Sequence, residues 1–175
     1  MTGPTRLTRE HILELFDRLN EELADVATIG ELYLVGGAVM CLALNAREST
    51  ADVDALFEPT QTVREAAVRV GAAAGVGDKW LNDAVKGFLS PRGEFDPFLE
   101  LSHLRVFVAH PEYLLAMKCA AMRLGAEFHD LDDVRYLLRW LNITKLDEAL
   151  VIVTRYFDEE RLPPKTRLAL EELLG

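Results

Sequence analysis

The sequence predicts an α+β protein in which a small mixed β-sheet with flanking helices is followed by a C-terminal helical cap. Half of the 175 residues are hydrophobic and 27% are charged, which is the composition of a folded domain with a sizeable core. Before Pro111, short apolar runs alternate with helical patterns, and behind it only helical patterns follow. Strands followed by a run of helices are typical of the α+β class.

The chain length is close to the usual size of one domain. The sequence shows no linker, low-complexity stretch or internal repeat. We therefore expect a single domain over residues 1–175, with a sheet-containing core at about 1–110 and a helical part at about 111–175.

The first elements are predicted from spacing and from turn residues. Residues 8–26 carry apolar side chains three or four positions apart with charges between them, which predicts an amphipathic helix. The apolar run 32–35 stops at Gly36 and Gly37 before a helix-like stretch at 38–45, so we expect a strand, a tight turn and a helix there.

The next elements are separated by proline and glycine. Residues 51–58 suit a partly buried strand closed by a proline, and residues 61–74 suit a helix ended by glycines. Further strands are expected at 83–89 and 99–109, on either side of a turn at 90–93.

The second part of the chain predicts four helices. Proline and aspartate stand where a helix begins, ahead of apolar residues at helical spacing. In chain order, we expect helices at 111–124, 130–141 and 146–157 and, behind Pro163 and Pro164, a last helix that ends at Gly175.

Charge and cysteine content limit the classes of function. Lys and Arg number 19 and Asp and Glu number 29, so the net charge is −10. A nucleic-acid partner would therefore have to meet a local positive patch. Cys41 and Cys119 lie far apart in apolar stretches, which argues against a disulfide framework or a zinc knuckle. Without an apolar signal segment or a run of about 18 apolar residues, the sequence predicts a cytoplasmic protein with no membrane span.

Asp52 and Asp54 form a pair of acidic residues on the predicted strand 51–58. Side chains at positions i and i+2 of a strand share one face, with Cα atoms roughly 7 Å apart. Two carboxylates held so close repel each other, and a divalent ion such as Mg²⁺ between them removes the repulsion. The alternative is a pair that is simply solvated at a strand edge.

Gly36 and Gly37 form a tight turn before a helix. Glycine lets the backbone approach a phosphate closely, and the first turn of the helix presents N–H groups to an anion. A phosphate cradle followed by a metal-binding strand would hold a nucleoside triphosphate at two points. A lone Gly-Gly pair is usually only a turn, so the signal lies in the combination.

The segment from Leu34 through Gly36, Gly37, Arg47 and Thr50 to Asp52 and Asp54 resembles the signature of the nucleotidyltransferase fold shared with DNA polymerase β. Nearly the whole chain is similar to the small bacterial nucleotidyltransferase-like proteins related to AbiEii and MenT toxins. The stretches that carry this wider resemblance are 80–83, 113–118 and 129–134.

The resemblance implies a Mg²⁺-dependent enzyme that transfers a nucleotide from a nucleoside triphosphate (NTP) to an acceptor. It implies two carboxylates on the second strand and often a third on the next. Asp83 is our candidate for the third, with a simple turn at Asn82 and Asp83 as the alternative; Asp96 and Glu100 are weaker substitutes. The sequence departs from the commonest pattern at Gly37, where many members have serine.

Lys118 lies on the predicted helix 111–124 between Leu114 and Met122, in an apolar stripe. A lysine there loses hydration unless its ammonium reaches a phosphate or a carboxylate, or extends past the stripe to water. Asp130 fits an N-cap of the following helix. In the resembling proteins a lysine and a following aspartate at these places belong to the active site.

The sequence thus predicts a nucleotidyltransferase in which Asp52, Asp54 and Asp83 bind Mg²⁺, Gly36 and Gly37 hold phosphates, and Lys118 and Asp130 take part in catalysis. Arg47 is a further candidate for contact with the nucleotide, or pairs with Glu48 or Asp52. By resemblance, the acceptor is the 3′ end of tRNA, and the protein is a toxin with a cognate antitoxin. The alternatives are a non-catalytic nucleotide- or protein-binding module and a transferase for a small hydroxylated molecule, whose amino groups would suit an acidic surface.

Overall fold

The computed structural model of the chain describes residues 6–122 and 130–174, which divide into two compact units. The sheet unit consists of the chain up to Gly87 together with Phe95–Ala109, and the helical unit consists of Phe88–Glu94 together with the chain from His110. The fold is α+β, with a mixed five-stranded sheet in the first unit. That the whole chain behaves as one domain stays a prediction.

The sheet has the strand order β5-β4-β2-β7-β6. Strand β2 pairs antiparallel with β4 and parallel with β7, and β4 pairs parallel with β5. A separate two-stranded ladder joins β1 to β3. The strands are β1 (Leu7–Thr8), β2 (Gly30–Val35), β3 (Ser49–Thr50), β4 (Val53–Glu58), β5 (Leu81–Asn82), β6 (Phe95–Glu100) and β7 (Leu104–Ala109).

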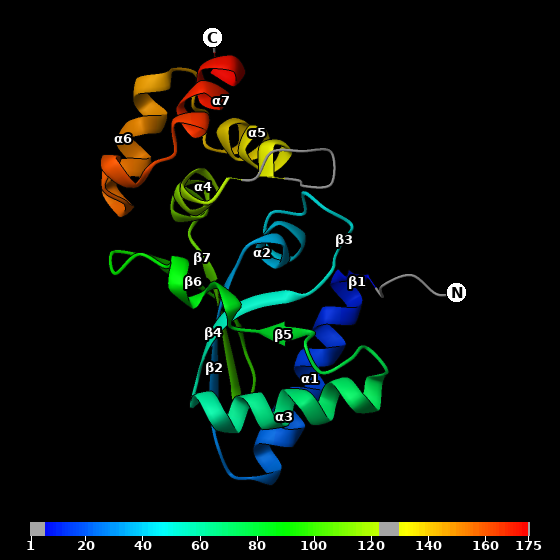
Figure 1. The fold of residues 1–175 in the computed structure, drawn as a ribbon. Coiled ribbons are helices and arrows are strands. Elements are labelled where there is room, and N and C mark those ends of the chain that lie inside the picture. Colours follow the sequence, from blue (N-terminus) through cyan, green and yellow to red (C-terminus); the bar gives the residue numbers. More distant parts are fainter. Residues whose placement is uncertain (1–5, 123–129, 175) are drawn as a thin grey trace. The chain divides into compact units, whose positions relative to one another are not determined.

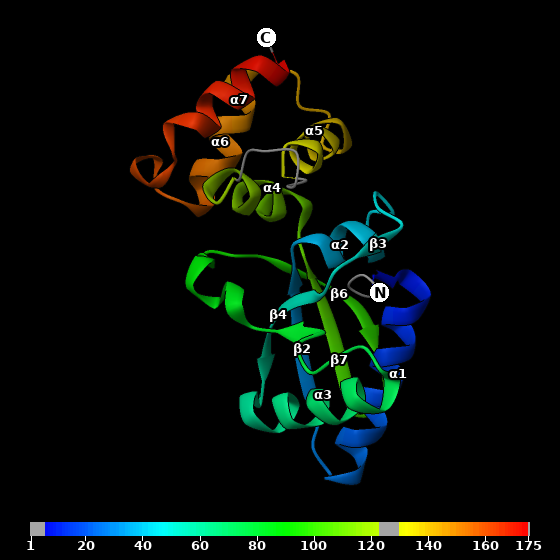
Figure 2. The same cartoon turned by 45° about the vertical axis from the view of Figure 1, so that its right-hand side comes forward.

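Helices α1 (Arg9–Asp25) and α3 (Thr60–Ala74) pack against each other and against the sheet (Figure 1). Alternate residues of β4, such as Val53 and Ala55, are fully buried, because a strand turns every second side chain to the same face. Thr8 caps α1 by accepting a hydrogen bond from the His11 N–H at 3.2 Å. The short helix α2 (Gly37–Leu42) begins where β2 ends, as the turn at the two glycines predicted (Figure 2).

The helical unit consists of four helices and the segment Phe88–Glu94. Its core contains the fully buried side chains of Tyr113, Val134 and Leu170. The helices are α4 (Pro111–Ala120), α5 (Asp130–Trp140), α6 (Leu146–Tyr156) and α7 (Pro164–Leu174). They agree with the helices predicted from sequence, except that α4 ends at Ala120, before the expected end at about 124; residues 123–129 lie outside the described residues.

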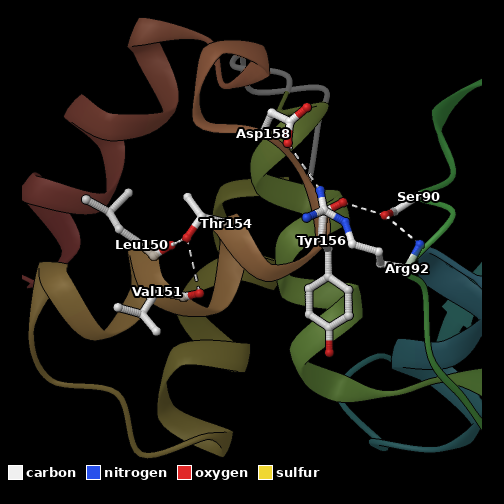
Figure 3. A network of polar contacts seen from close by, with 7 residues as sticks. All are labelled: Ser90, Arg92, Leu150, Val151, Thr154, Tyr156 and Asp158. Carbon is white, nitrogen blue, oxygen red and sulfur yellow. Dashed lines mark hydrogen bonds and ion pairs between the residues drawn. The ribbon is translucent and has the colours of Figure 1, made fainter.

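Ser90 holds the segment Phe88–Glu94 against helices α4 and α6 of the helical unit. Its hydroxyl donates to the backbone oxygen of Tyr156, and its own N–H donates to the hydroxyl of Tyr113 at 3.0 Å. Arg92 adds an ion pair with Asp158 at 3.4 Å (Figure 3). The Tyr113 side chain on α4 and the Tyr156 backbone on α6 therefore hold this segment against the helices.

The strand expected at 83–89 is wrong. The two-residue strand β5 (Leu81–Asn82) ends just before this stretch, and a 3₁₀-helix at Ala84–Phe88 occupies most of it. Asn82 accepts a hydrogen bond from the Ala84 N–H at 3.3 Å, so local turn chemistry overrides the apolar pattern. The strand expected at 99–109 is also wrong in extent, since this stretch holds the end of β6 and, after a hairpin, β7.

Within residues 6–122 and 130–174, no helix combines the length and the hydropathy needed to cross a bilayer.

Candidate functional site

Strand β4 positions Asp52 and Asp54. The two residues flank Val53, which is fully buried on the helix-covered face of the sheet, and both are partly exposed. Asp52 directly precedes the strand and Asp54 is its second residue. Because alternate side chains of an extended segment point to the same side, the two carboxylates lie on the face opposite Val53.

Strand β5 adds Asn82 to this pair. Asn82 lies beside Asp54 in the parallel register of β4 and β5. Its Nδ2 donates to Oδ2 of Asp52 at 3.1 Å. Sequence reasoning gave Asn82 no role of its own: it stood in the resembling stretch 80–83 and, as the alternative, in a simple turn. The available signal was the polar residue directly after the apolar Leu81, since in a strand that residue faces away from the core.

Asp83 lies one residue further and makes other contacts. Its Oδ2 is 2.8 Å from Arg64 Nη2 on α3 and 3.7 Å from Lys86 Nζ. In the described part of the chain, no three His, Cys, Asp or Glu side chains gather closely enough to hold a metal ion. The structure therefore brings Asp52 and Asp54 together without Asp83.

The two substitute carboxylates are also accounted for. Asp96 is exposed on the edge strand β6, and Glu100 lies 3.7 Å from Arg105 Nε on the neighbouring strand. Within the residues described, neither belongs to a group of three or more His, Cys, Asp or Glu side chains that could hold a metal ion.

The glycine turn lies directly beside Asp54. Val35 is the register partner of Asp54 in the β2–β4 ladder, and Gly36 follows it with φ 69° and ψ −147°. This left-handed conformation favours glycine. A Cβ atom on Gly36 would stand 3.4 Å from Oδ2 of Asp54. The backbone corner and the carboxylate are thus neighbours.

Gly37 is packed against Arg47 and Thr50. A Cβ atom on Gly37 would stand 2.8 Å from Nη1 of Arg47 and 2.8 Å from Oγ1 of Thr50, closer than real Cβ atoms approach such atoms. Thr50 also donates to the backbone oxygen of Asp52 at 3.2 Å. The space that a serine side chain would need at position 37 is therefore filled by two polar side chains, and the Arg47 guanidinium lies at the turn.

An aromatic surface continues from the carboxylates along the same face of the sheet. Leu56, two residues after Asp54, is the register partner of Tyr33. The Tyr33 ring stacks on Phe107 with centroids 5.0 Å apart and meets Phe95 edge-on at 5.4 Å. Burial, together with the nearby Glu31 and Glu58 carboxylates, raises the pKa of Tyr33. Its phenol therefore stays neutral and can rest against a flat ring.

In the helical unit, Lys118 lies between two buried carboxylates. Its Nζ is 3.1 Å from Oδ1 of Asp130 and 2.9 Å from Oδ2 of Asp133, and the three side chains are 11%, 5% and 3% exposed. Asp130 is the first residue of α5, and His129 lies outside the described residues. The sequence predicted a carboxylate or a phosphate for Lys118, but it missed Asp133, which follows Asp130 by one helical turn.

The residues at β4 suit a hard divalent cation. Two carboxylates on one face supply the oxygen ligands that Mg²⁺ prefers, and Mg²⁺ in nucleotide sites typically takes one or two carboxylates plus phosphate oxygens. The nearby backbone corner at Gly36 carries no side chain of its own, so its backbone can approach such phosphates closely. In chemical terms, the arrangement can hold a metal-bound polyphosphate.

Comparison with protein-family models, with curated proteins and with solved structures found no match to this chain. The fold and the site define an α+β protein whose mixed sheet carries paired carboxylates beside a glycine corner.

Proposed function

We propose that this protein has the nucleotidyltransferase-like fold and is a Mg²⁺-dependent nucleotidyltransferase, which transfers a nucleotide from an NTP to an acceptor hydroxyl. One observation carries the proposal: Oδ2 of Asp54 lies against the Gly36 corner, with Asp52 on the same face of the sheet. A metal ligand and a phosphate-approach point are thereby adjacent, as the joint binding of a metal and a triphosphate requires.

In this reaction Asp52 and Asp54 hold the metal ion, and Mg²⁺ when bound supplies charge stabilisation to the phosphate oxygens. The backbone at Gly36 and Gly37 orients the phosphates. The Arg47 guanidinium, which lies against Gly37, is placed to pair with a phosphate oxygen. The half-buried rings of Tyr33 and Phe107 offer the nucleoside an apolar surface beside the carboxylates.

Lys118 and Asp130 remain proposed active-site residues on the resemblance alone. Their contacts with each other and with Asp133 account for the buried lysine without a substrate. The resemblance also implied Asp83 as a metal ligand, but its carboxylate is paired with Arg64 and Lys86, so the metal site that we propose consists of Asp52 and Asp54.

The resemblance favours the 3′ end of tRNA as the acceptor and a toxin role with a cognate antitoxin. A second candidate acceptor, a small hydroxylated molecule with amino groups, is favoured by the sheet face itself. Glu31 and Glu58 stand directly opposite each other in the β2–β4 ladder, and the chain carries a net charge of −10. Two adjacent carboxylates attract a cation and repel the backbone of RNA.

The test is transfer of label from each of the four NTPs, with Mg²⁺, to total RNA and to a panel of aminated hydroxyl compounds. We expect transfer to one of the two acceptor classes. Asp54→Asn and Asp52→Asn should abolish it, and Asp96→Asn, which changes an exposed carboxylate on β6, should leave it unchanged.

Calorimetry with Mg²⁺ and each NTP separates the enzyme from a non-catalytic module of the same fold. Binding that depends on Asp54, with no transfer to any acceptor, would identify the module. Absence of both binding and transfer would contradict the proposed function.

A further inference from the structure

Asn82 occupies the place beside Asp54 where a third carboxylate would complete the site. Register in the parallel β4–β5 pair sets Asn82 next to Asp54, and its side chain reaches Asp52. Asp83, by contrast, is paired with Arg64 at 2.8 Å. The residue of β5 that meets the two carboxylates is therefore a neutral amide.

Two hydrogen bonds fix the orientation of this amide. Its Nδ2 donates to Oδ2 of Asp52, and its Oδ1 accepts from the Ala84 N–H at 3.3 Å. A carboxylate only accepts and a backbone N–H only donates, so the opposite orientation of the amide would lose both bonds. The amide oxygen is thus directed to the backbone, and the amide nitrogen is directed to the site.

This arrangement has two consequences for Asp52. One carboxylate oxygen is held by the amide, which fixes the rotation of the carboxyl group and leaves the other oxygen for a cation. The amide also adds no charge, so the site holds two negative charges rather than three. One divalent ion balances the charge of two carboxylates. A third carboxylate would increase the repulsion among the carboxylates whenever no ion is bound.

We propose that Asn82 is a positioning residue of the metal site, which holds Oδ2 of Asp52 in place and restricts the site to two carboxylates and a single divalent ion. This inference rests on the proposed function, because it presumes that Asp52 and Asp54 bind a metal. It assigns Asp83 to a different task, the link from β5 to α3 through Arg64.

The test is titration of the nucleotide-free 175-residue chain with Mn²⁺, followed by electron paramagnetic resonance, in parallel with urea unfolding. We expect the unsubstituted protein to bind one Mn²⁺. Asn82→Ala should weaken that binding about 10-fold or more, as loss of a group that orients a metal ligand typically does. Asp83→Asn should leave it unchanged. Should Asn82→Ala not fold, Asn82→Ser replaces the amide by a shorter hydroxyl, which can still accept from the Ala84 N–H but no longer extends to Asp52 as the amide does, and is read in the same way.

Asn20→Ala is the matched control. Asn20 is also in the sheet unit, and its Oδ1 accepts from the His103 N–H at 2.7 Å. Its loss should lower the stability to urea without changing the Mn²⁺ affinity. Asn82→Asp gives a contrasting readout: it sets a third carboxylate against Asp52, so we expect a lower melting temperature without metal and a larger rise on adding Mn²⁺ than in the unsubstituted chain.

The outcomes separate this inference from the proposed function. Mn²⁺ binding that is lost in Asp54→Asn but unchanged in Asn82→Ala would overturn the role of Asn82 and leave the metal site intact. Equal weakening by Asp83→Asn and Asn82→Ala would also overturn it. No Mn²⁺ binding by the unsubstituted chain, with or without NTP, would overturn both.

Discussion

The ammonium of Lys118 lies 2.9 Å from Oδ2 of Asp133, and their side chains are only 11% and 3% exposed. Asp130 completes the cluster at 3.1 Å from the same ammonium. A buried charge is stable only when it is paired, and removing one partner of a buried pair leaves the other without compensation. The cluster links α4 to α5 inside the helical unit.

Lys118→Met should therefore destabilise the protein strongly. Two buried carboxylates would lose their cation, and we expect the free energy of unfolding to fall by about 3–5 kcal/mol in urea denaturation. Lys165→Met, a change at an exposed lysine on α7, is the control and should shift it by less than about 0.5 kcal/mol.

The triple change Lys118→Met, Asp130→Asn, Asp133→Asn removes the charges together. We expect it to recover part of the stability lost in Lys118→Met, because no buried carboxylate remains unpaired. If Lys118→Met unfolds at the same urea concentration as the unsubstituted chain, the cluster does not stabilise the helical unit.

Gly37→Ser, the change that restores the residue found in many resembling proteins, should destabilise this chain. A Cβ there would stand 2.8 Å from Oγ1 of Thr50, and crowding of this kind typically costs about 1–3 kcal/mol. Thermal unfolding measures this loss of stability. Gly87→Ala is the control, since a Cβ on Gly87 would meet nothing within 4 Å.

Thr50→Ala tests the cause of the crowding. When the Thr50 hydroxyl is removed, Gly37→Ser should cost less than it does in the unsubstituted chain, because the two residues share one space. Equal costs in both backgrounds would show that crowding by Thr50 does not exclude serine at position 37.

Buried acids make the helical unit sensitive to alkaline pH. Burial raises the pKa of the Cys119 thiol to about 12. Burial, with the Glu94 and Glu112 carboxylates adding to it, raises the pKa of Tyr156 to about 12. Each group keeps its proton in the folded protein at a pH where the unfolded chain has released it.

The direction of the effect follows from proton counting. The folded state binds more protons than the unfolded state between the ordinary pKa values of these groups, 9.0 and 10.0, and about 12, so the free energy of unfolding falls as pH rises through that window. Below it, the stabilisation is fully present.

Urea unfolding between about pH 8 and pH 11 measures this decline. Cys119→Ala removes one titrating group, so its stability should fall less steeply above about pH 9 than that of the unsubstituted chain. The same slope in both proteins would contradict the assignment of the decline to Cys119.

The sequence was sufficient where one local pattern determines the structure. Helical spacing located α1 and the helices of the second part, and the two glycines located the end of β2. It was insufficient at Asn82 and Asp83, because β5 has only two residues. No alternation is long enough there to show which neighbour faces the carboxylates. Only the end of strand β6 was predicted from sequence. The strand contains Pro97, a residue that argues against a central strand but is tolerated on an edge strand.

Pairing across the sequence could not be predicted at all. The contact between Gly36 and Asp54 depends on the register of β2 and β4, and the hydrogen bond from Asn82 to Asp52 depends on the register of β4 and β5. Asp133 was missed for a related reason: an acidic residue in the first turn of a helix suits the helix dipole, so nothing local marks it as the partner of Lys118.

Ser90→Ala should loosen the segment Phe88–Glu94 from the helical unit. The change removes the donor to the Tyr156 backbone oxygen and the acceptor of the Arg92 N–H. Buried polar groups left without partners cost about 1–3 kcal/mol each. We expect a lower urea midpoint, together with faster amide exchange across Phe88–Glu94 and faster tryptic cleavage after Arg92.

Two further variants make this result specific. Tyr113→Phe removes the acceptor of the Ser90 N–H and should speed exchange at that amide in the same way. Ser102→Ala, at an exposed serine of the sheet unit, should change neither exchange nor cleavage. If the amides of Phe88–Glu94 exchange at the same rate in Ser90→Ala as in the unsubstituted chain, the serine hydroxyl does not hold this segment in place. Asp158→Asn then tests the contribution of the ion pair between Arg92 and Asp158.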